Sequence, residues 1–476
     1  MNDYDSMIKD LIHEWRDLSP HGLSFLKISL ERHVIPIIYY YVRREIFHEK
    51  LVASEKSFKL KFNQFSKGII HIYWILLWTA KWLFFYSDNN HKIIVIAVGS
   101  DRELAHAYLK NLLNYAIEKN YRLVSLNVIC NRHYLFRKRI FYFPRFLYQF
   151  KFNTLISKFS DDWQPMLDEL KELVEKRIQI KVNFNPVKKF ISDYSRDYYC
   201  VNYFLNKYKE GIRLLVQDFD YTSNKNIYCE LFKLKNVPTV SLNHSVLVYK
   251  HIYELVYSEY SLIWGQHQRE RIKELSTRNL KKVSVIGRPL NFNRIARSNN
   301  EKKYWVYNLP SFENPAAETI YRSAEGTLEY INYIKEIIKE DSLKIHLLIN
   351  FHPNDSIKAL RKLGFEGGYF SFSEILKKTE LIFCEDSTIT IELLKSEVPI
   401  VYIADKHQND SFNFIYWRTA EIIYTKDYLR RGIQKSLENK IDIKKREEQF
   451  EYFFGNGKRF YENLRKELNV IISTKC

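Results

Sequence analysis

The residues with the clearest chemical potential form a run of acidic and hydroxyl side chains in the last quarter of the chain. Glu385, Asp386, Ser387 and Thr388 follow an apolar stretch that predicts a buried strand, and Glu392 comes one helical turn later. Ser and Thr are frequent helix N-caps, and their hydroxyls and the neighbouring amides can hold a phosphate. A carboxylate one turn into the helix can accept hydrogen bonds from a ribose. A plain helix cap followed by a solvated Glu is the alternative interpretation.

A second signal, His352 followed by Pro353, ends the apolar strand that precedes this run. A histidine at a strand tip can donate a hydrogen bond to a phosphate and stabilise a departing nucleotide. Proline cannot continue a strand ladder, so the strand must end there. The dipeptide alone is weak evidence, but its place one strand before the acidic and hydroxyl run indicates a nucleotide site.

Four more polar residues stand at the ends of predicted strands in the first half of the chain: Asp101, Asp218, Asp220 and His244. Ligands of open parallel sheets bind at the carboxyl ends of the strands. We therefore expect Asp101 and His244 to be candidate general bases and the Asp218–Asp220 pair to line an acceptor cleft. A plain turn residue at position 101 and a buried, hydrogen-bonded histidine at position 244 are the alternatives.

Motifs of several other enzyme classes are missing from the sequence. The turn at residues 99–101 has neither Gly-Lys-Ser/Thr nor GxGxxG, and no GxSxG elbow occurs, which argues against P-loop, nicotinamide and serine-hydrolase chemistry. No Cys or His pair has zinc-ligand spacing, so we expect no zinc site. An odd set of five cysteines fits a reducing compartment, and the first residues lack signal-peptide order, so a cytoplasmic protein is expected.

Beyond the first ninety residues, strand-like apolar runs alternate with amphipathic helical stretches. This alternation predicts an α/β fold with doubly wound parallel sheets. A polar, charged stretch at 291–303 is the candidate interdomain linker. We expect two Rossmann-like domains facing across a cleft, at 91–295 and 296–440, and a C-terminal helix at 441–476 packing back on the body. The stretch 135–193 is predicted to carry helices.

The N-terminal extension, residues 1–90, shows apolar residues at helical spacing and predicts helices. Within it, residues 68–86 are apolar, rich in Trp and about long enough to span a bilayer, although His71 and Lys81 interrupt them. A buried helix packed on the body and an interfacial helix with a Trp/Tyr belt both remain open. The lysines between positions 56 and 67 favour contact with anionic lipid.

The formal net charge of +18 favours anionic partners, such as nucleic acid, an acidic membrane leaflet or an anionic glycan. A Lys-rich solvated surface is the alternative explanation of this charge. Aromatic and basic residues interleave at 131–152, a pattern that can stack nucleic-acid bases. No recognisable nucleic-acid-binding module accompanies it, so no nucleic-acid partner is expected.

The order His-Pro, acidic-Ser/Thr, Glu and Val-Pro-Ile resembles the C-terminal domain of GT-B glycosyltransferases. It is similar to bacterial surface-polysaccharide enzymes: the CDP-glycerol and CDP-ribitol phosphotransferases of teichoic acid, the capsule Kdo transferases and the polysialyltransferases. VPTVSLNHS resembles their strand ending in His-Gly, and SVIGRPLNF resembles the Gly-x-Pro strand that closes their first domain. The resemblance covers about residues 92–439. The sequence departs from the family pattern at two places: Ser245 stands where those enzymes often have Gly, and the acidic run lacks the glycine of the polysialyltransferase motif. These departures concern the identity of the donor more than the fold.

The resemblance implies a metal-independent and inverting transferase that uses a CMP-, CDP- or UDP-linked sugar and no cofactor. Its acceptor would be a glycan or lipid-linked glycan of a capsule or lipopolysaccharide. The enzyme would be peripheral at the inner face of the cytoplasmic membrane, in contact with anionic lipid. Phosphate contacts would come from His352, Ser387 and Thr388, and the ribose contact from Glu392. The implied donor site comprises His352, Pro353, Glu385, Asp386, Ser387, Thr388 and Glu392.

Two other classes of protein fit parts of the pattern. A sugar-nucleotide epimerase would have two Rossmann domains and a similar Ser-Glu donor site, but the apolar segment 68–86 favours the transferase. A non-enzymatic, basic protein apposed to a membrane would explain the charge without a nucleotide site. Nucleotide binding in the C-terminal domain discriminates the transferase from that second class.

Overall fold

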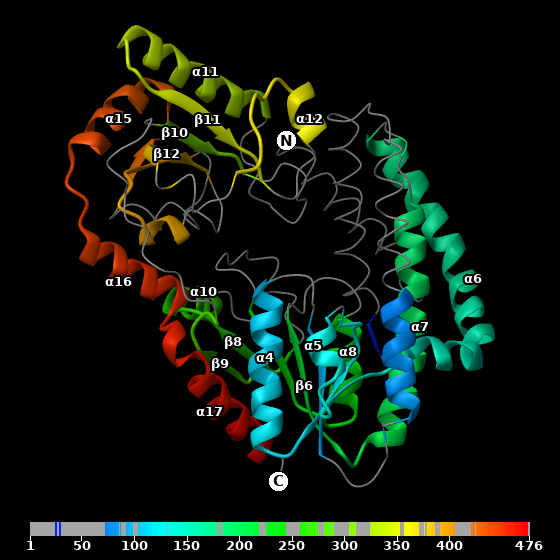
Figure 1. The fold of residues 1–476 in the computed structure, drawn as a ribbon. Helices are drawn as coiled ribbons and strands as arrows, with labels where there is room; N and C mark the ends of the chain where they lie inside the picture. Colours follow the sequence, from blue (N-terminus) through cyan, green and yellow to red (C-terminus); the bar gives the residue numbers. More distant parts are fainter. Residues whose placement is uncertain are drawn as a thin grey trace.

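The computed structural model contains two α/β domains, each built on one parallel sheet (Figure 1). The seven-stranded sheet has the order β5-β4-β3-β6-β7-β8-β9, and the five-stranded sheet has the order β11-β10-β12-β13-β14. The two Rossmann-like sheets expected from the sequence are confirmed. The structure describes residues 24–25, 28–29, 72–84, 86, 92–98, 103–129, 131–178, 181, 184–218, 225–243, 258–274, 280–289, 304–310, 324–352, 357–370, 376, 378–385, 391–404, 420–423 and 425–474.

The seven-stranded sheet forms because most of its strands are short runs buried on both faces, as parallel sheets require, whereas the edge strand β9 is partly exposed. Within this sheet the chain forms β3 first, moves outward to β4 and β5, and returns to β6 on the other side of β3. The strand order therefore reverses between β3 and β6. Its strands are β3 (Ile93–Ala97), β4 (Arg122–Ser125), β5 (Ile140–Tyr142), β6 (Ile212–Asp218), β7 (Thr239–Leu242), β8 (Tyr260–Ile263) and β9 (Lys282–Val285).

The return from β5 to β6 uses two long helices, α6 (Arg145–Ile178) and α7 (Asn185–Tyr208), which pack on each other. The helices predicted for residues 135–193 are thus confirmed, but the short strand β5 among the basic and aromatic residues was not predicted. The remaining helices of this domain are α4 (Glu103–Glu118), α5 (Arg132–Leu135), α8 (Lys225–Leu234) and α10 (Gln266–Glu274).

The five-stranded sheet reverses its strand order between β10 and β12, because β11 lies on the outer side of β10. Its strands are β10 (Tyr304–Asn308), β11 (His346–Asn350), β12 (Thr379–Cys384), β13 (Ile400–Ile403) and β14 (Glu421–Ile423). Its helices include α11 (Ala324–Glu340), α12 (Ile357–Lys362) and α15 (Leu429–Glu438).

The helix predicted after β12 ends soon after Glu392. The described part has helical turns at Ile391 and Glu392, followed by the 3-10 helix η1 (Leu393–Lys395). The Ser396 hydroxyl and backbone N–H both donate to the carbonyl of Leu393, at 2.7 and 2.9 Å. These bonds satisfy the Leu393 carbonyl at the end of the helical turn. The turn therefore ends before Pro399, which leads into β13.

The C-terminal segment returns from the five-stranded domain to the seven-stranded domain (Figure 1). It contains α16 (Ile443–Phe454), the 3-10 helix η4 (Gly457–Arg459) and α17 (Phe460–Ser473). The single C-terminal helix expected at 441–476 is instead broken at Gly455, which has φ +63°, a conformation that favours glycine. The apolar face of α17, including Phe460, Leu464 and Leu468, joins the core of the seven-stranded domain.

Two short strands, β1 (Ser24–Phe25) and β2 (Ile28–Ser29), pair antiparallel in the N-terminal extension. Helices were expected for this apolar stretch, so the expectation is wrong at these four residues. Short apolar runs do not distinguish strand from helix by spacing, and Phe and Ile both favour strands. The proposed linker at 291–303 and most of the extension lie outside the described residues.

The Trp-rich segment forms a helix at residues 72–84 that has two different faces. Trp74, Trp78 and Trp82 are buried against the seven-stranded domain, and the indole N–H of Trp78 donates to the carbonyl of Ile129 at 2.8 Å. On the other side Leu83 and Phe84 are 62% and 79% exposed, together with Ile72, Tyr73 and Leu76. The helix is therefore anchored in the core and still presents an apolar surface. No helix among the described residues has the length and apolarity to cross a membrane.

Candidate functional site

The structure describes four of the predicted site residues, namely Asp218, His352, Glu385 and Glu392. His352, Glu385 and Glu392 all follow strands of the five-stranded sheet, at its carboxyl edge. Asp218 is the last residue of β6, at the point where the order of the seven-stranded sheet reverses. The other predicted site residues lie outside the described residues: Asp101, Asp220, His244, Pro353, Asp386, Ser387 and Thr388.

Glu385 is buried directly after β12, beside the point where the strand order of the five-stranded sheet reverses. Its Oε1 accepts hydrogen bonds from the hydroxyls of Tyr307 at 2.6 Å and Thr327 at 3.1 Å. One carboxylate oxygen is therefore occupied by side chains of β10 and α11. This arrangement fixes the Glu385 side chain at the end of β12.

A buried pair of amides at the tips of β10 and β11 was not predicted from the sequence. The side-chain amide of Asn350 donates to Oδ1 of Asn308 at 2.9 Å, and Oδ1 of Asn350 accepts from the backbone N–H of Phe370 at 3.1 Å. The Nδ2 of Asn308 is buried and has no hydrogen-bond partner among the described residues. A buried donor without a partner costs about 1–3 kcal/mol, so a ligand oxygen at this strand tip would recover that energy.

Glu392 forms an ion pair with a residue of the other domain. Its Oε1 lies 3.0 Å from Nη1 of Arg288, which follows β9 of the other sheet. The two side chains are only 20% and 11% exposed. The carboxyl ends of β9 and β12 therefore meet at this ion pair, and Arg288 was not among the predicted site residues.

Aromatic rings from two parts of the chain surround the Arg288 guanidinium. Its central carbon lies 5.1 Å from the ring centre of Trp264, which follows β8, and 4.8 Å from that of Phe454 at the end of α16. The backbone N–H of Arg288 also donates to the carbonyl of Phe454 at 2.8 Å. Stacking of this kind suits the flat, weakly hydrated guanidinium group better than an ammonium group.

Three glycines allow the backbones to approach closely around Arg288. A Cβ on Gly265 would lie 2.2 Å from the carbonyl oxygen of Phe453, and one on Gly455 would lie 2.3 Å from that of Trp264. Gly287 has φ +87°, and a Cβ there would lie 2.7 Å from the carbonyl oxygen of Asn456. The strand ends of the seven-stranded domain are thus in direct backbone contact with the chain that connects α16 to α17.

Tyr108 of α4 connects this junction to the predicted acceptor side. Its hydroxyl accepts from the indole N–H of Trp264 at 2.6 Å and donates to the backbone carbonyl of Asn243. Asn243 directly precedes the candidate base His244 in the sequence. Burial raises the pKa of Tyr108 above its ordinary value, so the hydroxyl stays protonated.

The electrostatic environment of the interdomain pair opposes both charges. Burial raises the pKa of Glu392 above its ordinary value, although Arg288 acts in the opposite direction and Glu103 adds to the rise. Burial also lowers the pKa of Arg288, against the attraction of Glu392, Tyr108 and Glu103. Each charge therefore depends on the other, and perturbed carboxylates of this kind concentrate at functional sites.

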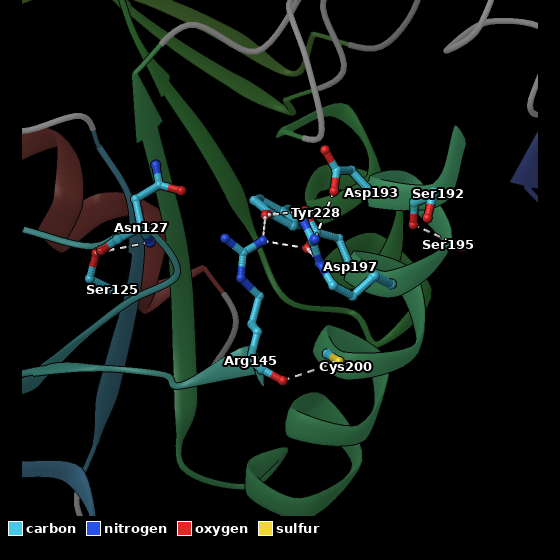
Figure 2. Close-up of polar contacts among 10 residues, drawn as sticks. Ser125, Asn127, Arg145, Ser192, Asp193, Ser195, Asp197, Cys200 and Tyr228 are labelled. Atoms are coloured by element: carbon cyan, nitrogen blue, oxygen red, sulfur yellow. Dashed lines mark hydrogen bonds and ion pairs between the residues drawn. The ribbon is translucent and has the colours of Figure 1, made fainter. Parts of the chain in front are cut away.

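A second buried ion pair lies inside the seven-stranded domain (Figure 2). Arg145, the first residue of α6, donates from Nη1 to Asp197 of α7 and to the hydroxyl of Tyr228 of α8, at 2.5 and 2.6 Å. The Tyr228 hydroxyl donates in turn to Oδ2 of Asp197 at 2.8 Å. The side chain of Asp197 is fully buried. This closed triangle joins three helices through their own side chains.

Comparison with known proteins gives similarities only to solved structures. No protein-family model matches the chain, and no curated protein matches it in sequence. A glycosyltransferase from Rickettsia africae has 10% identity and a TM-score of 0.46, over 81% of this chain and 99% of that one. The Anabaena protein HepE, in complex with UDP and glucose, has 10% identity and a TM-score of 0.41, over 81% and 100%.

The wall teichoic acid polymerase TagF is a third similar structure. It has 13% identity and a TM-score of 0.38, over 87% of this chain and 99% of that one. At such identities the substrates of these proteins do not carry over to this chain.

Proposed function

We propose that the protein is a GT-B glycosyltransferase that binds a nucleotide-activated sugar on the five-stranded domain and passes the sugar to an acceptor on the seven-stranded domain. The observation that carries this proposal is the contact between Glu392 and Arg288, where the carboxyl edges of both sheets meet. Ligands of doubly wound sheets bind at such edges, so a donor on one sheet and an acceptor on the other would come together here.

The residues around the junction have complementary roles in this proposal. Glu392 accepts hydrogen bonds from the donor's ribose, while His352 and the buried amide of Asn308 donate to its phosphate oxygens. Cationic and amide groups placed before the reaction can stabilise the charge that develops on a departing nucleotide. We therefore expect transfer without a bound metal, and full activity in EDTA would support this.

The donor is proposed to be a CMP-, CDP- or UDP-linked sugar. The support for this donor class is the order of motifs in the chain, which resembles that of surface-polysaccharide enzymes. The net charge of +18 suits an anionic glycan acceptor, such as that of a capsule or lipopolysaccharide.

Thermal unfolding in the presence of CMP, CDP, UDP and GDP tests the donor site. Ligands that bind the folded state raise the melting temperature by mass action. We expect one nucleotide to stabilise the wild type and Glu392→Ala to lose that effect. Glu118→Ala is the matched control, because Glu118 pairs with Arg465 on the surface of the seven-stranded domain. The absence of any shift in the wild type would count against the transferase.

The second part of the proposal is contact with an anionic lipid surface through the outer face of the helix at 72–84. The ammonium group of Lys81 donates to the carbonyls of Leu135 and Arg137, at 2.7 and 2.6 Å, and so holds the segment 135–137 beside the helix. That segment presents Phe136, which is 79% exposed, next to exposed basic residues. Apolar side chains flanked by positive charge suit an anionic membrane interface.

Sedimentation with phosphatidylcholine vesicles, with and without phosphatidylglycerol, tests this surface. The wild type should sediment with the anionic vesicles, less so at high salt, and the double variant Leu83→Glu with Phe84→Glu should stay in the supernatant. Leu437→Glu is the control, because Leu437 is an exposed apolar residue of α15 in the other domain. Equal sedimentation of the double variant and the wild type would refute a role for this helix.

A further inference from the structure

We propose that Arg288 is a positioning residue for the donor nucleotide: it keeps the Glu392 carboxylate ionised and aimed at the ribose, and so makes donor binding depend on the contact between the domains. This inference rests on the proposed function. It adds a residue from the seven-stranded domain to a donor site otherwise built from the five-stranded domain.

The geometry leaves part of the carboxylate open to a ligand. Nη1 of Arg288 lies 3.0 Å from Oε1 of Glu392. An ionised carboxylate has about four acceptor positions on its two oxygens, so Oε2 can still accept from two ribose hydroxyls. The 20% exposure of the Glu392 side chain leaves room for that approach.

The position of Arg288 is itself fixed by both sides of the junction. Its guanidinium lies against Trp264 and Phe454, and its backbone N–H binds the carbonyl of Phe454. Because Gly287 is in backbone contact with Asn456, the arginine cannot shift without moving the chain between α16 and α17. A carboxylate paired with this arginine is therefore held in one place relative to both sheets.

The charged and titratable groups around Glu392 are few among the described residues. Arg288 from the end of β9 favours its ionised form, and Glu103 from the start of α4 opposes it. Tyr108 from α4 faces Arg288 and remains protonated. Without Arg288, burial and Glu103 would act on Glu392 unopposed, so its pKa would rise further.

The test compares a nucleotide with its 2′-deoxy form across pH. Calorimetry with CDP and 2′-deoxy-CDP, or the corresponding pair for whichever of CMP, UDP or GDP binds best, gives the share of affinity due to the ribose. Loss of a charge-assisted hydrogen bond should weaken ribonucleotide binding about tenfold in Glu392→Gln. At pH 6 we expect Arg288→Met to show the same reduced preference for the ribonucleotide over its 2′-deoxy form as Glu392→Gln. At pH 8 this preference should return toward the wild-type value.

Two further variants separate positioning from stability. Arg288→Lys keeps the charge but not the flat stacking group, so it should restore part of the ribose discrimination. Glu118→Gln, which alters a surface ion pair, should bind nucleotides like the wild type. Melting temperatures without nucleotide show any loss of fold in each variant.

The outcomes distinguish this inference from the proposed function. Nucleotide binding by the wild type with no change of affinity or pH profile in Arg288→Met would overturn the inference alone. A pH-independent loss in Arg288→Met would also overturn it, because that would make the arginine merely structural. Failure of the wild type to bind any of the four nucleotides would overturn the proposed function and the inference together.

Discussion

Arg145 with Asp197 and Arg288 with Glu392 are two buried arginine–carboxylate pairs among the described residues. The pKa of the arginine is shifted in opposite directions in the two pairs. Around Arg145, burial acts to lower the pKa, but Asp197, Tyr228 and Tyr142 together raise it above its ordinary value. Around Arg288, burial prevails, and the pKa falls despite Glu392. The first pair lies within one domain and is closed by a tyrosine hydroxyl, whereas the second joins two domains and its Glu392 side chain is 20% exposed.

This difference separates a pair that supports the fold from a pair suited to a ligand. A buried pair whose hydrogen bonds are all made within the protein resists disruption but gains nothing from a new partner. A buried carboxylate with a raised pKa gains from hydrogen bonds that favour its ionised form. We infer that Glu392 can bind a polyol, while Asp197 cannot.

The largest effect is expected for Asp197→Ala, which leaves Arg145 buried without its counter-charge. Breaking such a pair destabilises a protein by about 3–5 kcal/mol, and denaturation in urea should show a loss of that size. Asp168→Ala on α6 is the control, because Asp168 pairs with Lys188 at 3.2 Å while 52% exposed and should cost less than about 1 kcal/mol.

Replacement of both partners provides the complementary test. Arg145→Met combined with Asp197→Leu removes the charges together, so it should recover most of the lost stability. If Asp197→Ala were as stable as the wild type, the contrast between the two pairs would disappear.

An intermediate effect is expected for Gly287→Ala at the junction. Gly287 and Gly364 have φ of +87° and +91°, so alanine at either position should cost about 1–3 kcal/mol of backbone strain. Only Gly287 adds a backbone clash, because a Cβ on Gly364 has its nearest neighbour, Cδ1 of Leu328, at 3.7 Å. Urea denaturation and nucleotide calorimetry should show that Gly287→Ala loses more stability than Gly364→Ala, and that it alone weakens nucleotide binding.

The smallest effect is a pH dependence of nucleotide affinity in the wild type. Because the pKa of Glu392 is raised above 4.5, its carboxylate protonates at a higher pH than an exposed Glu on acidification. Ribonucleotide affinity should therefore decrease as the pH falls toward that raised pKa, and calorimetry from pH 8 to pH 5 would measure it. If ribonucleotide affinity did not change with pH and followed the same profile as that of the 2′-deoxy nucleotide, a contact between Glu392 and the ribose would be contradicted.

Much of the architecture follows from the sequence, because apolar strands and amphipathic helices alternate in both halves. His352 and Glu392 are also recognisable in the sequence, since they are polar residues that come soon after the apolar runs of β11 and β12. Arg288 was missed because its partner lies in the other domain, and no local pattern reveals a contact between the ends of two sheets. Asn308 was missed for a similar reason, since its significance depends on a hydrogen bond to its Nδ2 that none of its described neighbours supplies.

The short strand β5 and the end of the helix after β12 show a second limit. β5 has only three residues, Ile140–Tyr142, and it lies within a basic and aromatic stretch without alternation. The helical turns after Glu392 end early because Ser396 bonds back to Leu393, a local competition that apolar spacing does not record.

The burial of the tryptophans has an optical consequence. The sequence contains eight, and the six that the structure describes are all buried: Trp74, Trp78, Trp82, Trp163, Trp264 and Trp305. The outer face of the helix at 72–84 exposes Leu, Ile, Tyr and Phe, so vesicles touching it would leave the indoles of that helix in their present surroundings. The emission of Trp264, whose ring lies against Arg288, would instead follow events at the domain junction. The emission of these six described tryptophans should thus respond to nucleotides while remaining nearly silent to lipid.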